Sequence, residues 1–203
     1  TLRDSVSSMS LRRLACILLG AWLGGALLMG WVAMESFRSV DRAMKEPAAL
    51  STAQYQKLGP AAVRQLLRYQ VSEQNRFLFQ NWELAQLGLG LLIFGLLLFG
   101  TSVGQIELAL PLVMLFLVAI AHWFLTPQMV ALGRILDFLP AGAPALEETR
   151  LRTLHSAYTV MEILKLAVGV VLGVLLSWRR VRRKGTAREI EAIDDGNNRH
   201  VNG

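Results

Sequence analysis

The stretch of sequence that decides the fold is residues 154–184, LHSAYTVMEILKLAVGVVLGVLLSWRRVRRK. Its centre, residues 166–176, is apolar, and with its flanks it is long enough to cross a bilayer as a helix. A tryptophan and five basic residues end this helix: Trp178, Arg179, Arg180, Arg182, Arg183 and Lys184. Such a group is typical of a helix end at a membrane surface, where it also attracts anionic lipid. The stretch therefore predicts a transmembrane helix with a lipid-binding, basic end.

Four polar side chains lie on one face of the same predicted helix. They follow one another at steps of three, four and three: His155, Tyr158, Glu162 and Lys165. Residues at these steps share one side of a helix. The same face continues at steps of four with Gly169, Gly173 and Ser177. We expect an ionisable stripe that leads into a seam of small residues suited to close helix packing.

The composition excludes a soluble globular domain. Of the 203 residues, 53% are hydrophobic and 18% are charged, whereas soluble domains carry about a quarter charged residues. Four apolar runs predict membrane spans at about residues 14–34, 84–103, 108–132 and 154–178. The predicted fold is all-α, an integral membrane bundle of four transmembrane helices in a single domain, residues 1–184. The polar tail, residues 185–203, is expected to be solvated or disordered.

The first span begins after Arg12 and Arg13. Its apolar run is too long for a typical signal peptide and lacks a small-x-small cleavage site, so we expect it to remain uncleaved. Gly20 and Gly24 recur at a step of four, as Gly169 and Gly173 do in the last span. These four glycines are the predicted helix-packing positions.

Between the first two spans lies an extramembrane segment, residues 39–82. The apolar residues that follow Gly59-Pro60 recur at helical spacing: Val63, Leu66, Leu67 and Val71. This pattern predicts an amphipathic helix that lies on the membrane surface or caps the bundle. In contrast, only residues 104–107 separate the second and third spans, which predicts an antiparallel hairpin.

The basic residues also indicate orientation and partners. Four spans place both termini on one side, and the basic residues that flank the first and last spans favour the cytoplasm. Arginine outnumbers lysine 17 to 4, which hints at a GC-rich bacterial genome and so at a bacterial inner membrane. The net charge of +6 does not indicate nucleic-acid binding, because six basic residues lie beside the last span, within residues 179–188.

The ionisable residues fall at one depth. At ~1.5 Å per helical residue, Lys165 and Glu162 lie roughly 20 and 24 Å from Trp178, and His122 lies roughly 21 Å from Leu108. By the same reasoning, the residues near the outer boundary are Glu35, Glu83, Gln86 and His155. We therefore predict a shared polar layer in the outer half of the membrane. The candidate polar site is His122, His155, Tyr158, Glu162 and Lys165.

Three interpretations of this layer stay open. A mid-membrane charge costs at least ~2.5 kcal/mol, which Glu162 and Lys165 lower if they form an ion pair that locks helix register. Alternatively, the layer is a site for a proton, an ion or a small ligand. The third interpretation is haem or chlorophyll bound by His122 or His155, or zinc bound by both with Glu162. The two histidines differ by about 10 Å in depth, which argues against one shared haem. Pro127 is expected to kink the third span beside His122.

No catalytic motif stands out in the sequence. It contains no H-E-x-x-H, no G-x-S-x-G and no P-loop, and we predict a protein that is not an enzyme. Its single cysteine, Cys16, excludes an internal disulfide framework and a Cys-rich metal site, and no resident metal is predicted.

Three short patches resemble the transmembrane protein 205-like group of small four-span proteins. They are Gly20-Ala21-Trp22 through Trp31-Val32 to Phe37-Arg38-Ser39, His122-Trp123-Phe124-Leu125-Thr126-Pro127, and Leu154-His155-Ser156. The resemblance implies a four-helix bundle with His155 as a shared polar residue, and it implies no known reaction. This chain departs from the family pattern at Glu162 and in the long segment 61–82.

These observations lead to three hypotheses on function. The first is an accessory or structural subunit of a larger membrane complex, which binds lipid and other membrane subunits or a second copy of itself. The alternative is a small transporter or ligand-binding protein that uses the outer polar site. The third is a haem- or chlorophyll-binding subunit of an electron-transfer or photosynthetic complex.

Overall fold

The protein is helical throughout the part of the chain that this computed structural model describes. The backbone is described for residues 2–45, 57–100, 103–137 and 145–201, and side chains for residues 10–45, 57–100, 103–137 and 146–178. The elements are α1 (Leu2–Ala43), α4 (Pro60–Gly100), α5 (Gln105–Ile120), the π-helical turn η1 (Ala121–Leu125), α6 (Thr126–Asp137) and α7 (Ala145–Val201). The predicted all-α class is confirmed.

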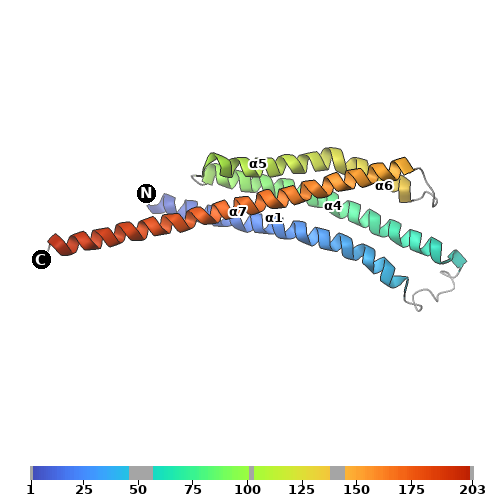
Figure 1. Cartoon of the computed structure of the whole chain (residues 1–203), viewed down its shortest axis with the longest axis horizontal. Helices are drawn as coiled ribbons and strands as arrows, with labels where there is room; N and C mark the ends of the chain where they lie inside the picture. Colours follow the sequence, from blue (N-terminus) through green and yellow to red (C-terminus); the bar gives the residue numbers. More distant parts are fainter. Residues whose placement is uncertain (1, 46–56, 101–102, 138–144, 202–203) are drawn as a thin grey trace.

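Four stretches of helix are long and apolar enough to cross a membrane. They are Ser10–Ala43, Pro60–Gly100, Gln105–Asp137 and Leu146–Trp178. This confirms the prediction of a multi-pass integral membrane protein. The start of α1 and the end of α7 lie at the same end of the bundle (Figure 1). Which side of the membrane that end faces stays a prediction. The basic cluster, residues 179–184, and the tail, residues 185–203, have no described side chains.

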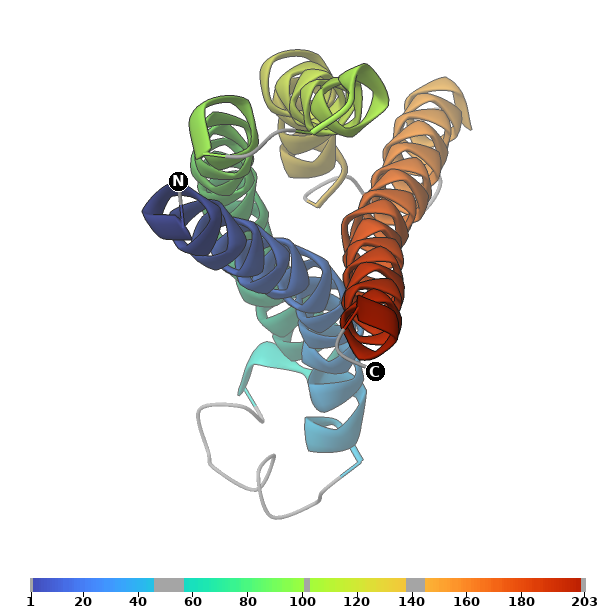
Figure 2. The same ribbon diagram turned by 90° about the vertical axis from the view of Figure 1, so that its left-hand side faces the viewer.

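The four spans form a ring. α1 contacts α4 and α7, and α5 contacts the same two helices from the other side, as the view along the bundle shows (Figure 2). Nearest the termini, apolar side chains fill the ring: Ala15, Leu19, Trp22, Ile93, Leu97, Met114, Val118, Leu172 and Leu176. Toward the opposite end, α1 and α4 diverge from α6 and α7 (Figure 1). The bundle therefore has a closely packed apolar end and a wider end.

The segment between the first two spans differs from the prediction. The helix expected from Ala61 onward is not a separate element, because it forms the first half of α4, which continues without a break into the second span. The physical reason is that no glycine or proline interrupts the chain between Pro60 and Gly88. At ~1.5 Å per residue α4 is about 60 Å long, twice the ~30 Å of a hydrocarbon core. Residues 46–56, which include Pro47, lie outside the described residues.

The second and third spans form the antiparallel hairpin that the short link predicts. α4 packs against α5, and the backbone N–H of Gly104 donates to Oε2 of Glu107 at 2.5 Å, which caps the start of α5. The third span is distorted where Pro127 predicted a kink, and the distortion is a π-helical turn. In this turn the N–H of Thr126 donates to the carbonyl oxygen of Ala121, five residues earlier.

The glycines divide into two groups. A Cβ on Gly169 would lie 2.7 Å from Cδ2 of Leu23, so α1 and α7 approach each other closely there. A Cβ on Gly173 would meet Leu19 only at 3.6 Å. Gly20 and Gly24 are exposed, with nothing within 4 Å of an added Cβ. Their role in packing against a further protein stays a prediction.

Candidate functional site

The site begins with the buried face of α4. Along this face the buried residues recur at mixed steps of three and four: Asn75, Glu83, Gln86, Gly90, Ile93 and Leu97. The first three are polar and the last three are apolar or glycine. A matching face on α7 has buried Tyr158 and Lys165 ahead of buried Leu172 and Leu176. Because α4 and α7 meet the same neighbour α5, their polar halves come together inside the bundle.

The carboxylate of Glu83 lies at the centre of the site and is fully buried. Its Oε2 lies 3.0 Å from Nδ1 of His122, and its Oε1 accepts a hydrogen bond from Oγ1 of Thr126 at 2.5 Å. His122 lies in the π-helical turn and Thr126 directly follows it, both in the third span, so this carboxylate joins α4 to that span. Burial of a carboxylate is costly unless hydrogen bonds compensate it, and both oxygens of Glu83 have a partner here.

The ammonium group of Lys165 is buried beside this carboxylate site. Only 1% of the residue is exposed, and Nζ donates to Oε1 of Gln86 at 2.9 Å and to Oε1 of Glu162 at 2.6 Å. The spacing of Glu162 and Lys165 predicted this ion pair, and the structure contains it. Its partner Glu162 is only partly buried. Lys165 therefore depends on Glu162 and Gln86 for all of its observed polar contacts.

Tyr158 interacts with both parts of the site. Its hydroxyl is buried and interacts electrostatically with the carboxylates of Glu162 and Glu83. It forms no hydrogen bond of ordinary geometry with any described residue. Its ring packs edge-to-face against Phe79, with 6.1 Å between ring centroids. We call the following residues the interior polar cluster: Glu83, Gln86, His122, Thr126, Tyr158, Glu162 and Lys165.

The formal charges of this cluster do not balance when His122 is neutral. Glu83 and Glu162 carry two negative charges, and Lys165 carries one positive charge. Inside a membrane an uncompensated charge is expensive.

His155 lies apart from the cluster although the sequence grouped it with the other polar residues. It is exposed on α7 and lines two adjoining cavities. Among the described residues there is no group of three or more His, Cys, Asp or Glu side chains that could hold a metal ion. The described residues do not bring His122, His155 and Glu162 into such a group, and zinc binding by them stays a prediction. Haem or chlorophyll binding by a single histidine stays a prediction.

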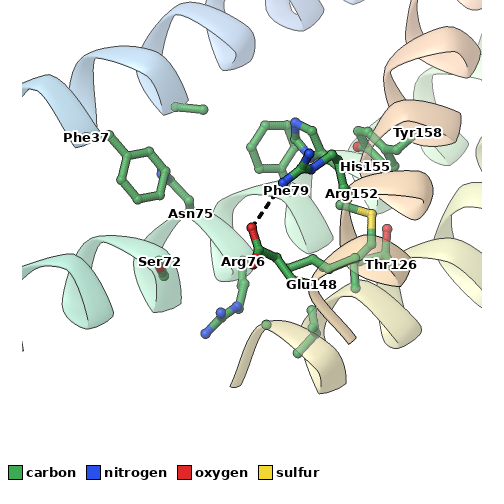
Figure 3. Close-up of a pocket in the computed structure, with 15 residues that line it drawn as sticks. Phe37, Ser72, Asn75, Arg76, Phe79, Thr126, Glu148, Arg152, His155 and Tyr158 are labelled. Atoms are coloured by element: carbon green, nitrogen blue, oxygen red, sulfur yellow. Dashed lines mark hydrogen bonds and ion pairs between the residues drawn. The ribbon is translucent and has the colours of Figure 1, made fainter. Parts of the chain in front are cut away.

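Two cavities adjoin the cluster at the wider end of the bundle. One, of about 460 Å³, lies among α1, α4, α6 and α7, and the other, of about 490 Å³, lies among α1, α4 and α7. They share five wall residues: Ala33, Phe37, Phe79, His155 and Tyr158. Figure 3 shows Phe37, Asn75 and Tyr158 around the first cavity. Both volumes are in the range of small-molecule sites.

Three residues of the cluster were missing from the sequence-based site. Glu83 and Gln86 were placed in the outer layer but not joined to the site, and Thr126 was read only as part of a patch. A signal for the first two exists, because Asn75, Glu83 and Gln86 continue the apolar seam of α4 at helical spacing. Thr126 had no such signal, since its position depends on the π-helical turn.

Comparisons with known proteins identify no relative. No protein-family model matches the chain, and no curated protein and no solved structure matches it either. The resemblance to the transmembrane protein 205-like group stays a prediction from its three short patches.

Proposed function

We propose that this multi-pass membrane protein is a small transporter or ligand-binding protein whose interior polar cluster binds one proton. The observation that carries the proposal is the fully buried carboxylate of Glu83, held by His122 and Thr126 while the nearby ammonium of Lys165 pairs with Glu162. Ionisable groups inside membrane spans are costly and are typical of ion and solute pathways.

The geometry also supports a link between this proton and a solute. Tyr158 belongs to the cluster and to the wall of both cavities, so a molecule in either cavity would contact the side chain whose hydroxyl interacts with the carboxylates. The charged groups that surround the proton come from α4 (Glu83), from η1 (His122) and from α7 (Glu162 and Lys165). α1 contributes mainly apolar side chains to these walls.

Spectroscopy on purified protein in lipid nanodiscs tests whether the cluster binds a proton. Nitrogen NMR of the imidazole rings reports a proton on His122, and infrared spectra report a protonated carboxyl on Glu83. We expect one of these two signals to show the bound proton, and Glu83→Gln to remove it. Glu35→Gln is the matched control, since Glu35 forms ion pairs with Arg42 and Arg38 outside the cluster. If neither signal shows a proton, the proposal is wrong.

A second candidate is an accessory subunit that packs against other membrane proteins. The observation in its favour is the uncovered surface at Gly20 and Gly24, which leaves room for a helix to approach α1 closely. Gly20→Leu combined with Gly24→Leu should then abolish co-purification with a partner or a second copy. Gly88→Leu is the control, because Gly88 is also uncovered but lies on α4. Equal partner recovery from both variants would contradict this candidate.

A further inference from the structure

Residues that line the two cavities carry buried hydrogen-bond donors that have no partner among the described residues. Asn75 and Tyr158 are both more than nine-tenths buried, and neither Nδ2 of Asn75 nor the Tyr158 hydroxyl has a hydrogen-bond partner among the described residues. Asn75 lines the first cavity and Tyr158 lines both (Figure 3). On the wall of the second cavity, Nε1 of Trp82 is buried and unpartnered as well. An unsatisfied buried donor costs about 1–3 kcal/mol, so an occupant that accepts these hydrogen bonds would be stabilised.

The charged groups on the walls already have partners within the chain. Arg76 pairs with Glu73 at 2.5 Å and with Asp137 at 2.6 Å. Arg152 pairs with Glu148 at 3.0 Å, the contact drawn in Figure 3. The surface that the cavities expose is otherwise mostly apolar. These walls therefore suit a neutral molecule better than an ion, because no unpaired charge is available to compensate an ionic head group.

The second cavity adjoins the outer surface of the first span. Its wall includes Leu27 and Met34, which are exposed on α1 at a level within that span. A molecule dissolved in the bilayer would meet this part of the wall without crossing water. Entry from this side favours a lipophilic occupant.

We propose that the two cavities bind a neutral lipophilic molecule that carries hydrogen-bond-accepting oxygens, with Asn75, Tyr158 and Trp82 as donors to those oxygens. Ester carbonyls of a neutral lipid and ring carbonyls of an isoprenoid quinone share this chemistry. The inference rests on the cavity walls and not on the charge balance of the cluster, so it goes beyond the proposed proton site. Asn75 has no contact with Glu83 or His122 among the hydrogen bonds described, which allows the two proposals to fail separately.

The experiment measures binding of three probes to the full chain in detergent by the shift in its unfolding temperature. The probes are dioctanoylglycerol, a short-chain prenylated benzoquinone, and hexadecane, which has no acceptor oxygen. We expect one acceptor-bearing probe to stabilise the protein and hexadecane to have no effect. Asn75→Leu and Tyr158→Phe should each weaken that binding about threefold to tenfold, the loss of one hydrogen bond. Whichever of the two acceptor probes binds identifies the source of the natural ligand as lipid or quinone.

A second pair of variants tests whether binding occurs in the cavities. Ala33→Trp places a large side chain in the wall that both cavities share and should abolish binding. Ala21→Trp is the matched control on α1, since Ala21 is exposed and lines neither cavity. Equal stabilisation by hexadecane, unchanged binding in Asn75→Leu and Tyr158→Phe, or no stabilisation by any probe would each overturn the inference. Loss of probe binding in Asn75→Leu with an intact proton signal would support it independently of the proposed function.

Discussion

Glu83 and His122, 39 positions apart in the chain, place Oε2 and Nδ1 3.0 Å from each other inside the bundle. This contact joins two different spans, whereas the ion pair of Glu162 and Lys165 lies within one helix. A contact between spans reports on how the helices are arranged, and a change in this contact can alter that arrangement. We therefore regard the contact of Glu83 with His122 as the most informative place to change the protein.

The second oxygen of Glu83 gives the first prediction, which concerns stability. Thr126→Val keeps the shape of the side chain and removes the hydroxyl that donates to Oε1 at 2.5 Å. Because hydrogen bonds to buried charged groups are strong, we expect a loss of about 2 kcal/mol in the free energy of unfolding. Thr126→Ser retains the donor and should cost less. Unfolding in mixed detergent measures both variants, and an equal loss from both would show that packing and not the hydrogen bond is responsible.

The buried ion pair predicts an asymmetry between its two partners. The side chain of Lys165 is 2% exposed and that of Glu162 is 23% exposed. Glu162→Leu therefore leaves a buried ammonium with only Gln86, and we expect a loss of about 3 kcal/mol. Lys165→Met leaves the less buried carboxylate of Glu162 without its partner, and because an unpaired charge within a span is still costly, the expected loss is about 2 kcal/mol.

The double variant separates this explanation from simple repacking. When Glu162→Leu and Lys165→Met are combined, neither charge of the ion pair remains. The double variant should therefore be more stable than Glu162→Leu alone. The measurement is again the free energy of unfolding in mixed detergent. If the two losses add, the ammonium group is not the cause of the asymmetry.

α7 shows most clearly how much of the fold and of the site the sequence predicts. The apolar run and its length predicted the span, and the spacing of Glu162 and Lys165 predicted their contact. The continuation of the same face at steps of four was less accurate, since Ser177 is exposed and Leu172 and Leu176 are buried instead. Each step of four advances about 40° beyond a full turn, so a stripe at constant steps of four leaves the buried side.

The partners of the site were harder to predict because they depend on tertiary structure. Nothing local in the sequence indicates that Glu83 lies beside His122 rather than at a membrane surface. The amphipathic helix after Pro60 was predicted outside the membrane, and its unbroken continuation into the second span sets the depth and direction of every side chain in α4. Which partner such a polar residue finds depends on which helices are neighbours in the bundle.

At the wider end of the bundle, the close approach of Gly133 to Arg76 gives a prediction about a second charged group. A Cβ at this position would lie 2.6 Å from Nη2 of Arg76, which pairs with Glu73 and Asp137. Gly133→Ala should displace the guanidinium and weaken the link between α4 and α6 by about 1 kcal/mol. In an Arg76→Gln background the same change should have no cost, because the obstructed guanidinium is absent. A loss of the same size in both backgrounds would contradict this explanation.

Gly88→Ala is the control for the intrinsic effect of replacing glycine in a helix. Nothing lies within 4 Å of an added Cβ at Gly88, so alanine should stabilise α4 by up to about 1 kcal/mol. The difference between the two glycine variants then measures the contact with Arg76. If Gly88→Ala is as harmful as Gly133→Ala, helix propensity and contact cannot be separated by this pair.

The π-helical turn gives the last prediction, which concerns the register of the third span. Deletion of Phe124, whose side chain is exposed, removes the one extra residue that a π-helical turn holds and leaves a regular α-helical turn. α6 then keeps its direction relative to α5, so Thr126 still faces Glu83 and Thr126→Val should cost about 2 kcal/mol in the full-length chain and in the deletion background. Deletion of the exposed Phe116 from the regular part of α5 should instead rotate the residues that follow by about 100° and abolish the cost of Thr126→Val. Loss of the cost in the Phe124 deletion would mean that the extra residue of the turn is needed to bring Thr126 to Glu83.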